Sequence, residues 1–229
     1  MDKKSVLKEY FGYFTFREGQ EELIDAILQN KDALGIMPTG AGKSVCFQVP
    51  ALIFPGVTIV VSPLVSLMKD QVNSLLQCGI KAAFINATLT EKQHELVMER
   101  AARGAYKIIY VAPERLQNKE FISLCGKMDI SMVCVDEAHC VSHWGHDFRP
   151  SYLNIKSFIE SLSKRPVVAA FTATATKRVR EDVAELIGLQ EPFEVVTGFD
   201  RPNLYFEVIK PKNKYVWLSN HLSIGRIFL

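Results

Sequence analysis

Residues 37–44 read Met37-Pro38-Thr39-Gly40-Ala41-Gly42-Lys43-Ser44 and lie between a short apolar run and a helical pattern. In such a loop, successive backbone N–H groups and the start of the following helix form a cradle for an anion. Gly40 and Gly42 let phosphates approach the backbone and permit a positive φ. Lys43 would reach the β- and γ-phosphates of a nucleotide, and the Ser44 hydroxyl would bind Mg²⁺. Met37 stands where the strict motif has its first glycine, so a glycine-rich turn with a solvated lysine is the alternative.

The rest of the chain alternates strand and helix on both sides of this loop. Apolar runs rich in valine and isoleucine predict strands at 32–37, 57–61, 82–85, 107–112, 131–135 and 167–171, with further strands at 195–197 and 204–209. Helical patterns occupy 20–29, 44–52, 64–78, 91–103, 119–126, 151–162 and 176–187, and 215–222 could form one more helix. Such alternation predicts an α/β fold with a mostly parallel sheet, helices on both faces, and ligands beyond the carboxyl ends of the strands.

Composition limits the classes of protein that are possible. The chain has 229 residues, 48% hydrophobic and 23% charged, which fits one large globular domain. No apolar run is long enough to cross a membrane, and the five cysteines are odd in number and lack C-x-x-C spacing, which favours a cytoplasmic location. Residues 209–229 carry four basic and no acidic residues, leaving 23 basic against 25 acidic residues in 1–208. Binding of nucleic acid would therefore have to rest on local sites.

A second motif, Asp136-Glu137-Ala138-His139, directly follows the strand predicted at 131–135. In a protein with a phosphate-binding loop, an acid at the end of a buried strand is suited to hold Mg²⁺, which we expect of Asp136. Glu137 would orient or deprotonate the water that attacks a phosphoanhydride. The alternative is a helix start that is rich in acid because of the helix dipole.

Together these two motifs resemble those of superfamily 2 helicases, and four further stretches narrow the resemblance to the RecQ family of DNA helicases. These stretches are 11–20, 140–150, 171–176 and a pair of shorter segments, 62–71 with 112–116. The resemblance covers about residues 7–209 and implies a single RecA-like P-loop domain. It also implies that Lys43, Asp136 and Glu137 are catalytic, with Ser44 and Asp136 holding Mg²⁺ through ATP.

The resemblance assigns the stretch 11–20 to recognition of adenine. Gln20 would pair with the base through an amide that is both donor and acceptor, and Tyr13 and Arg17 would flank the base. As an alternative, Gln20 is a surface residue at a helix start. The residues implied to hold the nucleotide are then Tyr13, Arg17, Gln20, Thr39, Gly40, Ala41, Gly42, Lys43 and Ser44.

The other stretches imply contact with single-stranded or duplex DNA and a link between DNA and hydrolysis. Trp144 and Phe148, in the aromatic-rich stretch 140–150, are suited to stacking on bases. Thr172 and Thr174 would hydrogen-bond the acidic motif, although a threonine-rich helix cap is the alternative. The full set implied for DNA contact or coupling is Pro63, Ser66, Lys69, Arg115, His139, Trp144, His146, Asp147, Phe148, Arg149, Thr172 and Thr174. The spacing of His139, His143 and His146 raises zinc as an alternative, but Gly145 and Pro150 favour a loop, so we expect no zinc.

The resemblance also predicts the organisation of the chain. Residues 1–208 would form the ATP-binding lobe, and residues 209–229 a linker and the truncated start of a second RecA-like lobe. Because that second lobe supplies the arginine finger in the family, we expect the isolated chain to bind ATP weakly, to hydrolyse it poorly and not to unwind DNA. The alternatives are a residual nucleotide- or DNA-binding module, and a P-loop ATPase or RNA helicase that does not act on DNA.

Overall fold

The structure, a computed structural model, describes residues 1–198, 207, 208, 210, 211 and 213–222. Two compact units are present, Met1–Gly198 and Phe199–Leu229. The described part of the second unit contains one helix, α9 (Lys214–Leu222), where the sequence suggested a helix at 215–222. The strand expected at 204–209 lies largely outside the described residues, and a domain boundary at 208/209 stays a prediction.

A seven-stranded sheet forms the centre of the first unit, with strand order β3-β4-β2-β5-β6-β1-β7. Every neighbouring pair is parallel. The strands are β1 (Ala33–Ile36), β2 (Val57–Val61), β3 (Ala82–Ile85), β4 (Ile108–Val111), β5 (Ile130–Val135), β6 (Val167–Thr172) and β7 (Phe193–Val196). The sheet therefore confirms the predicted α/β class, and its central strands are buried as their continuous apolar sequences require.

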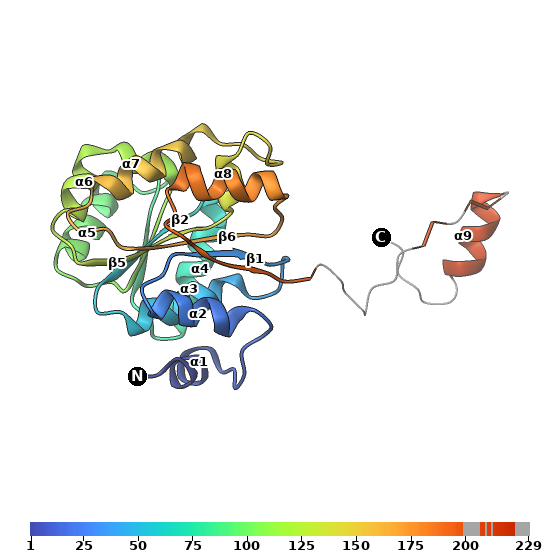
Figure 1. Cartoon of the computed structure of the whole chain (residues 1–229), viewed down its shortest axis with the longest axis horizontal. Coiled ribbons are helices and arrows are strands. Elements are labelled where there is room, and N and C mark those ends of the chain that lie inside the picture. The colour runs from blue at the N-terminus through green and yellow to red at the C-terminus, as the bar shows by residue number, and fades with distance from the viewer. Residues whose placement is uncertain (199–206, 209, 212, 223–229) are drawn as a thin grey trace. The chain divides into compact units, whose positions relative to one another are not determined.

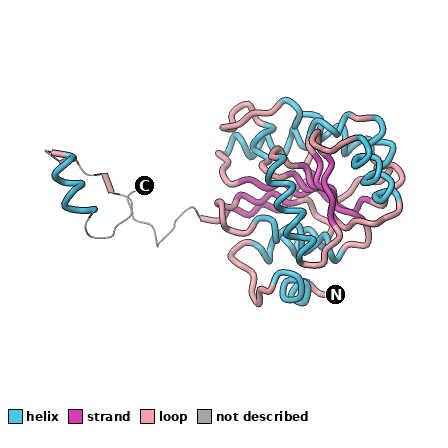
Figure 2. The backbone as a smooth tube through the Cα atoms, turned by 180° about the vertical axis from the view of Figure 1, so that it is seen from behind, coloured by secondary structure: helices cyan, strands magenta, loops and turns pink. Residues whose placement is uncertain are grey.

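Helices cover both faces of this sheet (Figures 1 and 2). The helices of this unit are α1 (Lys3–Phe11), α2 (Gln20–Leu28), α3 (Lys43–Ile53), α4 (Val65–Gln77), α5 (Glu91–Ala102), α6 (Lys119–Cys125), α7 (Asn154–Ser161) and α8 (Lys177–Ile187), and α1 packs on α2 and α3. Side chains of α2, α3 and α4 pack on one face, and those of α6, α7 and α8 on the other. Three short 3-10 helices connect these elements: η1 (Pro113–Gln117), η2 (Ala138–Val141) and η3 (Pro150–Leu153).

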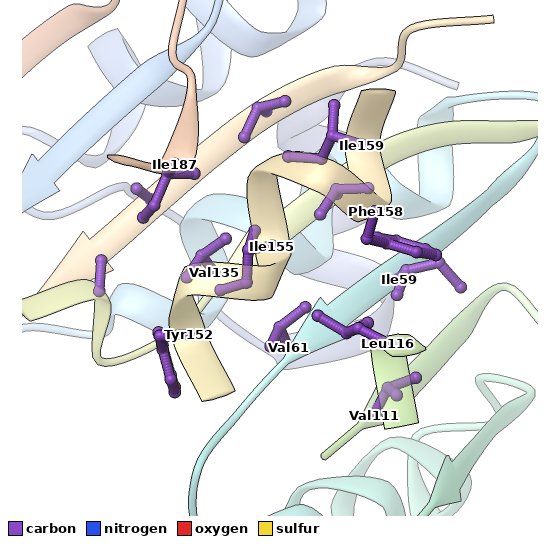
Figure 3. Close-up of a cluster of buried hydrophobic side chains, with 14 of the residues drawn as sticks. Ile59, Val61, Val111, Leu116, Val135, Tyr152, Ile155, Phe158, Ile159 and Ile187 are labelled. Atoms are coloured by element: carbon purple, nitrogen blue, oxygen red, sulfur yellow. The ribbon is translucent and has the colours of Figure 1, made fainter. Parts of the chain in front are cut away.

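Successive side chains of β5 pack alternately against the helices on the two faces of the sheet. Val133 and Val135 belong to the cluster under α7, whereas Met132 and Cys134 belong to the cluster under α3. Figure 3 shows Ile155 of α7 among the side chains of the first cluster, beside Val135. Successive side chains of a strand point to opposite faces, so an apolar run without alternation is what a sheet covered on both sides needs.

The amino end of β1 is fixed by a buried carboxylate, Asp32. Its side chain, 2% exposed, pairs with Arg165 at 2.6 Å. It also accepts hydrogen bonds from the backbone N–H of Val168 at 2.9 Å and of Gln190 at 2.7 Å. A buried carboxylate is tolerated only when it is paired and hydrogen-bonded in this way. Asp32 thus joins β1, β6 and the segment between α8 and β7.

Two helices differ from the sequence prediction. The helix expected at 151–162 is a 3-10 turn, η3, followed by α7 from Asn154. The other is α1, for which no helix was predicted; it is capped by the Asp2 carboxylate, which accepts from the N–H groups of Lys4 at 2.9 Å and Ser5 at 3.1 Å. Among the described residues, no helix has both the length and the apolar character that crossing a membrane requires.

Candidate functional site

The phosphate-binding loop predicted at 37–44 joins the carboxyl end of β1 to the start of α3. Gly40 and Gly42 both have φ of +84°, a conformation that residues with a Cβ rarely adopt. Lys43 is the first residue of α3, and its Nζ donates to the carbonyl of Met37 at 3.1 Å. The loop remains accessible, because Thr39 and Gly40 are exposed and Ala41, Gly42, Lys43 and Ser44 are partly exposed.

The stretch expected to contact adenine lies directly against this loop. Gln20 donates from Nε2 to the carbonyls of Ala41 and Gly42, both at 3.1 Å, and its Oε1 accepts from the N–H of Arg17 at 2.8 Å. The Arg17 guanidinium donates to the carbonyl of Gly40. Gln20 is only 3% exposed, so the alternative that it is a surface residue is wrong.

A cleft of about 370 Å³ runs along this contact. Its lining combines the predicted adenine-contacting side chains with the phosphate-binding loop: Tyr13, Thr15, Arg17, Gln20, Gly40, Gly42, Lys43, Ser44 and Val45. Tyr13 is 53% exposed, so its side chain is accessible to a ligand in the cleft. The fold therefore gathers residues that are more than 20 positions apart in the sequence into one opening.

Asp136 and Glu137 follow β5 at the same edge of the sheet. Burial raises the pKa of Asp136 to about 6, with a further contribution from the neighbouring Glu137 carboxylate. The pKa of Glu137 is lowered, chiefly by a hydrogen bond with His139. The positive charge of Lys43 contributes to lowering the pKa of both carboxyls. The two acids therefore differ in environment, Asp136 being desolvated and Glu137 held in its ionised form.

The backbone of the acidic motif has an unusual local geometry. Glu137 has φ of +47°, which is unusual for a residue with a side chain. Its N–H donates to Asp136 Oδ1 at 3.0 Å, and the Tyr152 hydroxyl donates to the Asp136 carbonyl at 2.9 Å. Tyr152 is itself fully buried. Strain of this kind persists where the surroundings hold the residue in place and is often found at functional sites.

A hydrogen-bonded chain connects the acidic motif to the end of β6. His139 Nδ1 lies 2.8 Å from Thr172 Oγ1 and 3.3 Å from Glu137 Oε2. The Thr172 hydroxyl donates to the Thr174 carbonyl at 3.2 Å, so its oxygen is left to accept from His139, which assigns the ring proton to Nδ1. The Thr172 carbonyl in turn accepts from the N–H of Met37 at 3.0 Å. Thr172 thus contacts both the phosphate-binding loop and the acidic motif.

The aromatic-rich stretch 140–150 folds as η2 followed by a turn. Two ring pairs hold it: His139 of the acidic motif stacks on His146 with ring centres 4.0 Å apart, and His143 stacks on Phe148 at 3.7 Å. Within the described residues, no three histidine, cysteine, aspartate or glutamate side chains gather as a group that could hold a metal ion. One face of the Phe148 ring is thus covered by His143, whereas Trp144 is 62% exposed.

Charged residues of this stretch are also engaged with the protein. Arg149 pairs with Asp147 at 2.9 Å and donates from Nη1 to the Pro63 carbonyl at 2.9 Å. The stretch is thereby connected to the loop after β2, where Ser66 and Lys69 are exposed in the first turns of α4. Arg115, after β4, is partly buried and donates to the Asn86 carbonyl at 3.2 Å. The residues predicted for DNA contact or coupling therefore lie at the ends of the neighbouring strands β4, β2, β5 and β6, but Arg115 and Arg149 have protein partners.

Sequence reasoning missed three residues that hold this stretch in place. The Arg178 guanidinium lies 3.8 Å from the centre of the Trp144 ring. The Ser142 hydroxyl donates to Asp182 Oδ2 at 2.5 Å and accepts from the Trp144 N–H at 3.1 Å. One signal was available, because the first turn of α8 contains basic residues and no acid, contrary to the preference set by the helix dipole.

A parallel sheet with a glycine-containing loop and helix start after β1, and an acidic strand end at β5, is the arrangement of a P-loop α/β domain. The chain belongs to the DEAD/DEAH box helicase family, whose model matches residues 17–183.

Comparison with individual proteins narrows the family to the RecQ helicases. Over 224 residues the chain is 46% identical to "ATP-dependent DNA helicase RecQ" of Bacillus subtilis, a match that covers 97% of this chain and 38% of that protein. It is 45% identical over 205 residues to the protein of the same name from Pasteurella multocida, covering 90% of this chain and 32% of that one. These matches confirm the RecQ resemblance predicted from the motifs. The chain spans about a third of the length of these curated relatives.

Solved structures confirm the fold. A hypothetical ATP-dependent RNA helicase from Sulfolobus tokodaii superposes with a TM-score of 0.65 at 24% identity, covering 85% of this chain and 57% of that one. The DUF1998 helicase MrfA gives a TM-score of 0.66 at 18% identity over 85% of this chain and 32% of that one. At these identities the likeness concerns the architecture, a single RecA-like domain.

Proposed function

We propose that this chain is the ATP-binding motor lobe of a RecQ-type 3′–5′ DNA helicase. In that role it binds ATP with Mg²⁺ and takes part in the hydrolysis that is coupled to movement along single-stranded DNA. The whole activity would be the unwinding of duplex DNA in repair and recombination, in the cytoplasm, and at the nucleoid if the source is bacterial. The proposal rests above all on one observation: Thr172 joins the phosphate-binding loop to the acidic motif, since its carbonyl accepts from the N–H of Met37 at 3.0 Å and its hydroxyl lies 2.8 Å from His139 Nδ1.

The residues present fit a magnesium nucleotide. Mg²⁺ prefers oxygen ligands and keeps several waters, and Ser44 and Asp136 offer a hydroxyl and a carboxylate at this edge of the sheet. Burial is the main cause of the raised pKa of Asp136, and a bound cation would offset it by favouring the ionised carboxylate. When bound, the ion would neutralise charge on the phosphates.

Each remaining residue of the site then has a defined task. The backbone of Thr39, Gly40, Ala41 and Gly42 cradles the phosphates, and Lys43 exchanges its bond to the Met37 carbonyl for the β- and γ-phosphates. Glu137 orients and deprotonates the attacking water, a task for which its lowered pKa keeps it ionised.

Recognition of adenine would change the bonding of Gln20. Both amide hydrogens of Gln20 are donated to carbonyls of the phosphate-binding loop, so pairing with a base requires one of these bonds to break. Tyr13 and Arg17, which line the same cleft, would contact the ring. Binding of the base and the conformation of the loop would therefore be linked through one side chain.

DNA contact would be linked to hydrolysis through His139 and Thr172. His139 Nδ1 is within hydrogen-bonding distance of both Glu137 and Thr172, and its ring stacks on His146 of the aromatic-rich stretch. A movement of that stretch when DNA binds would therefore be transmitted to Glu137, the carboxylate that orients the attacking water. Trp144 offers the exposed ring for a base, with Ser66 and Lys69 on neighbouring α4 available to the backbone.

A second candidate is a nucleotide- or DNA-binding module without useful catalysis. The observations that favour it are the cleft at the phosphate-binding loop and the exposed Trp144 ring, which would suffice for binding without turnover. An arginine finger contributes about 10³–10⁵ in rate to phosphoryl transfer, and in the RecQ-like arrangement it comes from a second lobe. Alone, this chain should then bind nucleotide weakly and turn it over slowly.

Titration with a fluorescent ATP analogue tests the nucleotide site. Lys43→Ala should weaken binding at least about tenfold, since charge-assisted hydrogen bonds to phosphate contribute about 1.5–3 kcal/mol. Lys31→Ala is the matched control, because Lys31 is an exposed lysine before β1, and it should bind as the unmodified chain does. Equal affinity of the Lys43→Ala chain would refute the assignment of the loop.

Steady-state hydrolysis of ATP with and without single-stranded DNA separates the two candidates. Turnover that rises on addition of DNA, and that Trp144→Ala reduces, supports the motor lobe. Binding of both ligands without turnover supports the binding module. Turnover of the isolated chain at rates typical of helicases would contradict the requirement for a second lobe.

A further inference from the structure

The contact between Trp144 and Arg178 brings together residues that neither the phosphate-binding loop nor the acidic motif explains. The guanidinium of Arg178 lies 3.8 Å from the ring centre, close enough for a cation–π contact. The Trp144 side chain nevertheless remains 62% exposed. One face of the ring is therefore backed by a cation while much of the ring stays available to a ligand.

A second contact ties the backbone of the same stretch to the same helix. Asp182, one turn after Arg178 on α8, accepts from the Ser142 hydroxyl at 2.5 Å, and that hydroxyl accepts from the Trp144 N–H at 3.1 Å. Positions i and i+4 of a helix share one face. One face of α8 therefore holds the Trp144 ring and the adjoining backbone together.

Charge in the first turns of α8 supports a role towards an anion. Lys177, Arg178 and Arg180 are basic, and the first turn has no acid. Cations at the amino end of a helix oppose its dipole, so these residues cost helix stability rather than adding to it. Arg180 is partly engaged by Glu194 at 3.7 Å, whereas Arg178 is exposed beside the tryptophan.

We propose that Arg178 is a positioning residue for DNA: it backs the Trp144 ring so that one base of a single strand stacks on the opposite face. Its charge also favours the phosphates of that strand. A ring already fixed by α8 loses less freedom when a base binds, so part of the ordering cost of binding is removed in advance. This inference rests on the proposed DNA contact of Trp144 and adds α8 to the DNA-binding surface.

The test uses the chain with Trp217→Phe, because Trp144 and Trp217 are its two tryptophans. In this background, quenching of Trp144 emission by acrylamide should increase in Arg178→Gln, since the guanidinium no longer covers one face. Unchanged quenching and emission would show that the contact does not form in solution and would overturn the inference. This measurement needs no DNA and is independent of the proposed function.

Binding of a labelled thymidine oligonucleotide, followed by anisotropy, completes the test. Arg178→Gln should weaken binding about two- to tenfold, the range expected from losing one cation–π contact and one pre-ordered side chain. Arg178→Lys, which keeps the charge but loses the planar group, should fall between. Lys177→Gln removes a neighbouring charge from the same turn that already pairs with Glu181 at 3.9 Å, so it should change binding less than about twofold.

Failures of the inference and of the proposed function are distinguishable through Trp144→Ala. If Trp144→Ala weakens DNA binding but Arg178→Gln behaves like Lys177→Gln, Arg178 is not a positioning residue. Tighter binding by Arg178→Gln would show that the arginine competes with the base, which also overturns the inference. If Trp144→Ala has no effect on DNA binding, the DNA role of the aromatic-rich stretch itself is wrong.

Discussion

Replacing Asp136 by asparagine should make the nucleotide-free protein more stable at neutral pH, although it removes a residue proposed for magnesium. Burial raises the pKa of this carboxyl from the ordinary value of 3.8 to about 6. The folded chain therefore holds a proton there more tightly than the unfolded chain does, and ionisation at neutral pH lowers the free energy of unfolding. Asparagine has nearly the same shape and can still accept from the Glu137 N–H through its oxygen.

The size of the effect follows from the two pKa values. Each pH unit between them corresponds to 1.36 kcal/mol, so the full interval from 3.8 to about 6 corresponds to about 3 kcal/mol. The Asp136 residue is partly exposed, and solvent screening reduces this figure. We therefore expect Asp136→Asn to raise the free energy of unfolding by about 1–3 kcal/mol at pH 7.5, which for a chain of this size shifts Tm by about 2–4 °C per kcal/mol.

Urea unfolding of both proteins at several pH values gives the measurement. The gain should be complete above pH 7 and should decrease steadily between about pH 6 and pH 4, because the carboxyl of the unmodified chain is then protonated in the folded state. Glu137→Gln is the control: its pKa is lowered by His139, so its ionised form stabilises the fold and the substitution should bring no gain at pH 7.5. Equal or lower stability of Asp136→Asn at pH 7.5, or a gain of the same size at pH 4, would refute the reasoning.

Three other substitutions test the packing of the sheet and of the aromatic-rich stretch. Asp32→Asn should cost about 2–4 kcal/mol in urea unfolding, less than for a fully buried pair because its arginine partner is partly exposed, and a loss below 1 kcal/mol would contradict the role of this carboxylate. Gly35→Ala should cost about 1–3 kcal/mol, since the new Cβ would lie 2.7 Å from Cδ1 of Phe171; unchanged stability would mean that this ring moves freely. Gly145→Ala places a Cβ 2.4 Å from the His139 carbonyl oxygen, so it should displace the aromatic-rich stretch and weaken binding of single-stranded DNA in an anisotropy titration, whereas unaltered affinity would show that this turn is not needed.

Most of the sheet could be predicted because its signal is local. A strand buried on both faces is a continuous apolar run, and β2 and β3 begin and end where the sequence predicted. The phosphate-binding loop and the acidic motif follow such runs, so their place at one edge of the sheet also follows from the pattern. The break between η3 and α7 was missed, since Pro150 is compatible with either kind of helix start.

Partners far apart in the sequence could not be predicted from local patterns. Nothing in the residues around Thr172 says that its hydroxyl meets His139, or that Asp32 is held by Arg165. The same holds for Gln20, whose burial depends on the loop carbonyls that it meets, and whose role in reading adenine stays a prediction. Such contacts depend on how crossovers bring strand ends together, which requires the three-dimensional arrangement.

The position of β7 has a practical consequence for work with this chain. Among the described residues, this strand is bonded only to β1, so its outer row of backbone N–H and C=O groups faces away from the sheet. Phe193 is 40% exposed and Val196 52% exposed on the same strand. An unpaired edge with apolar side chains is a template for the edge of another molecule. At the high concentrations used for crystallisation or NMR, self-association should therefore begin at β7, and a lysine at Val196 would be the first change to make when solubility limits an experiment.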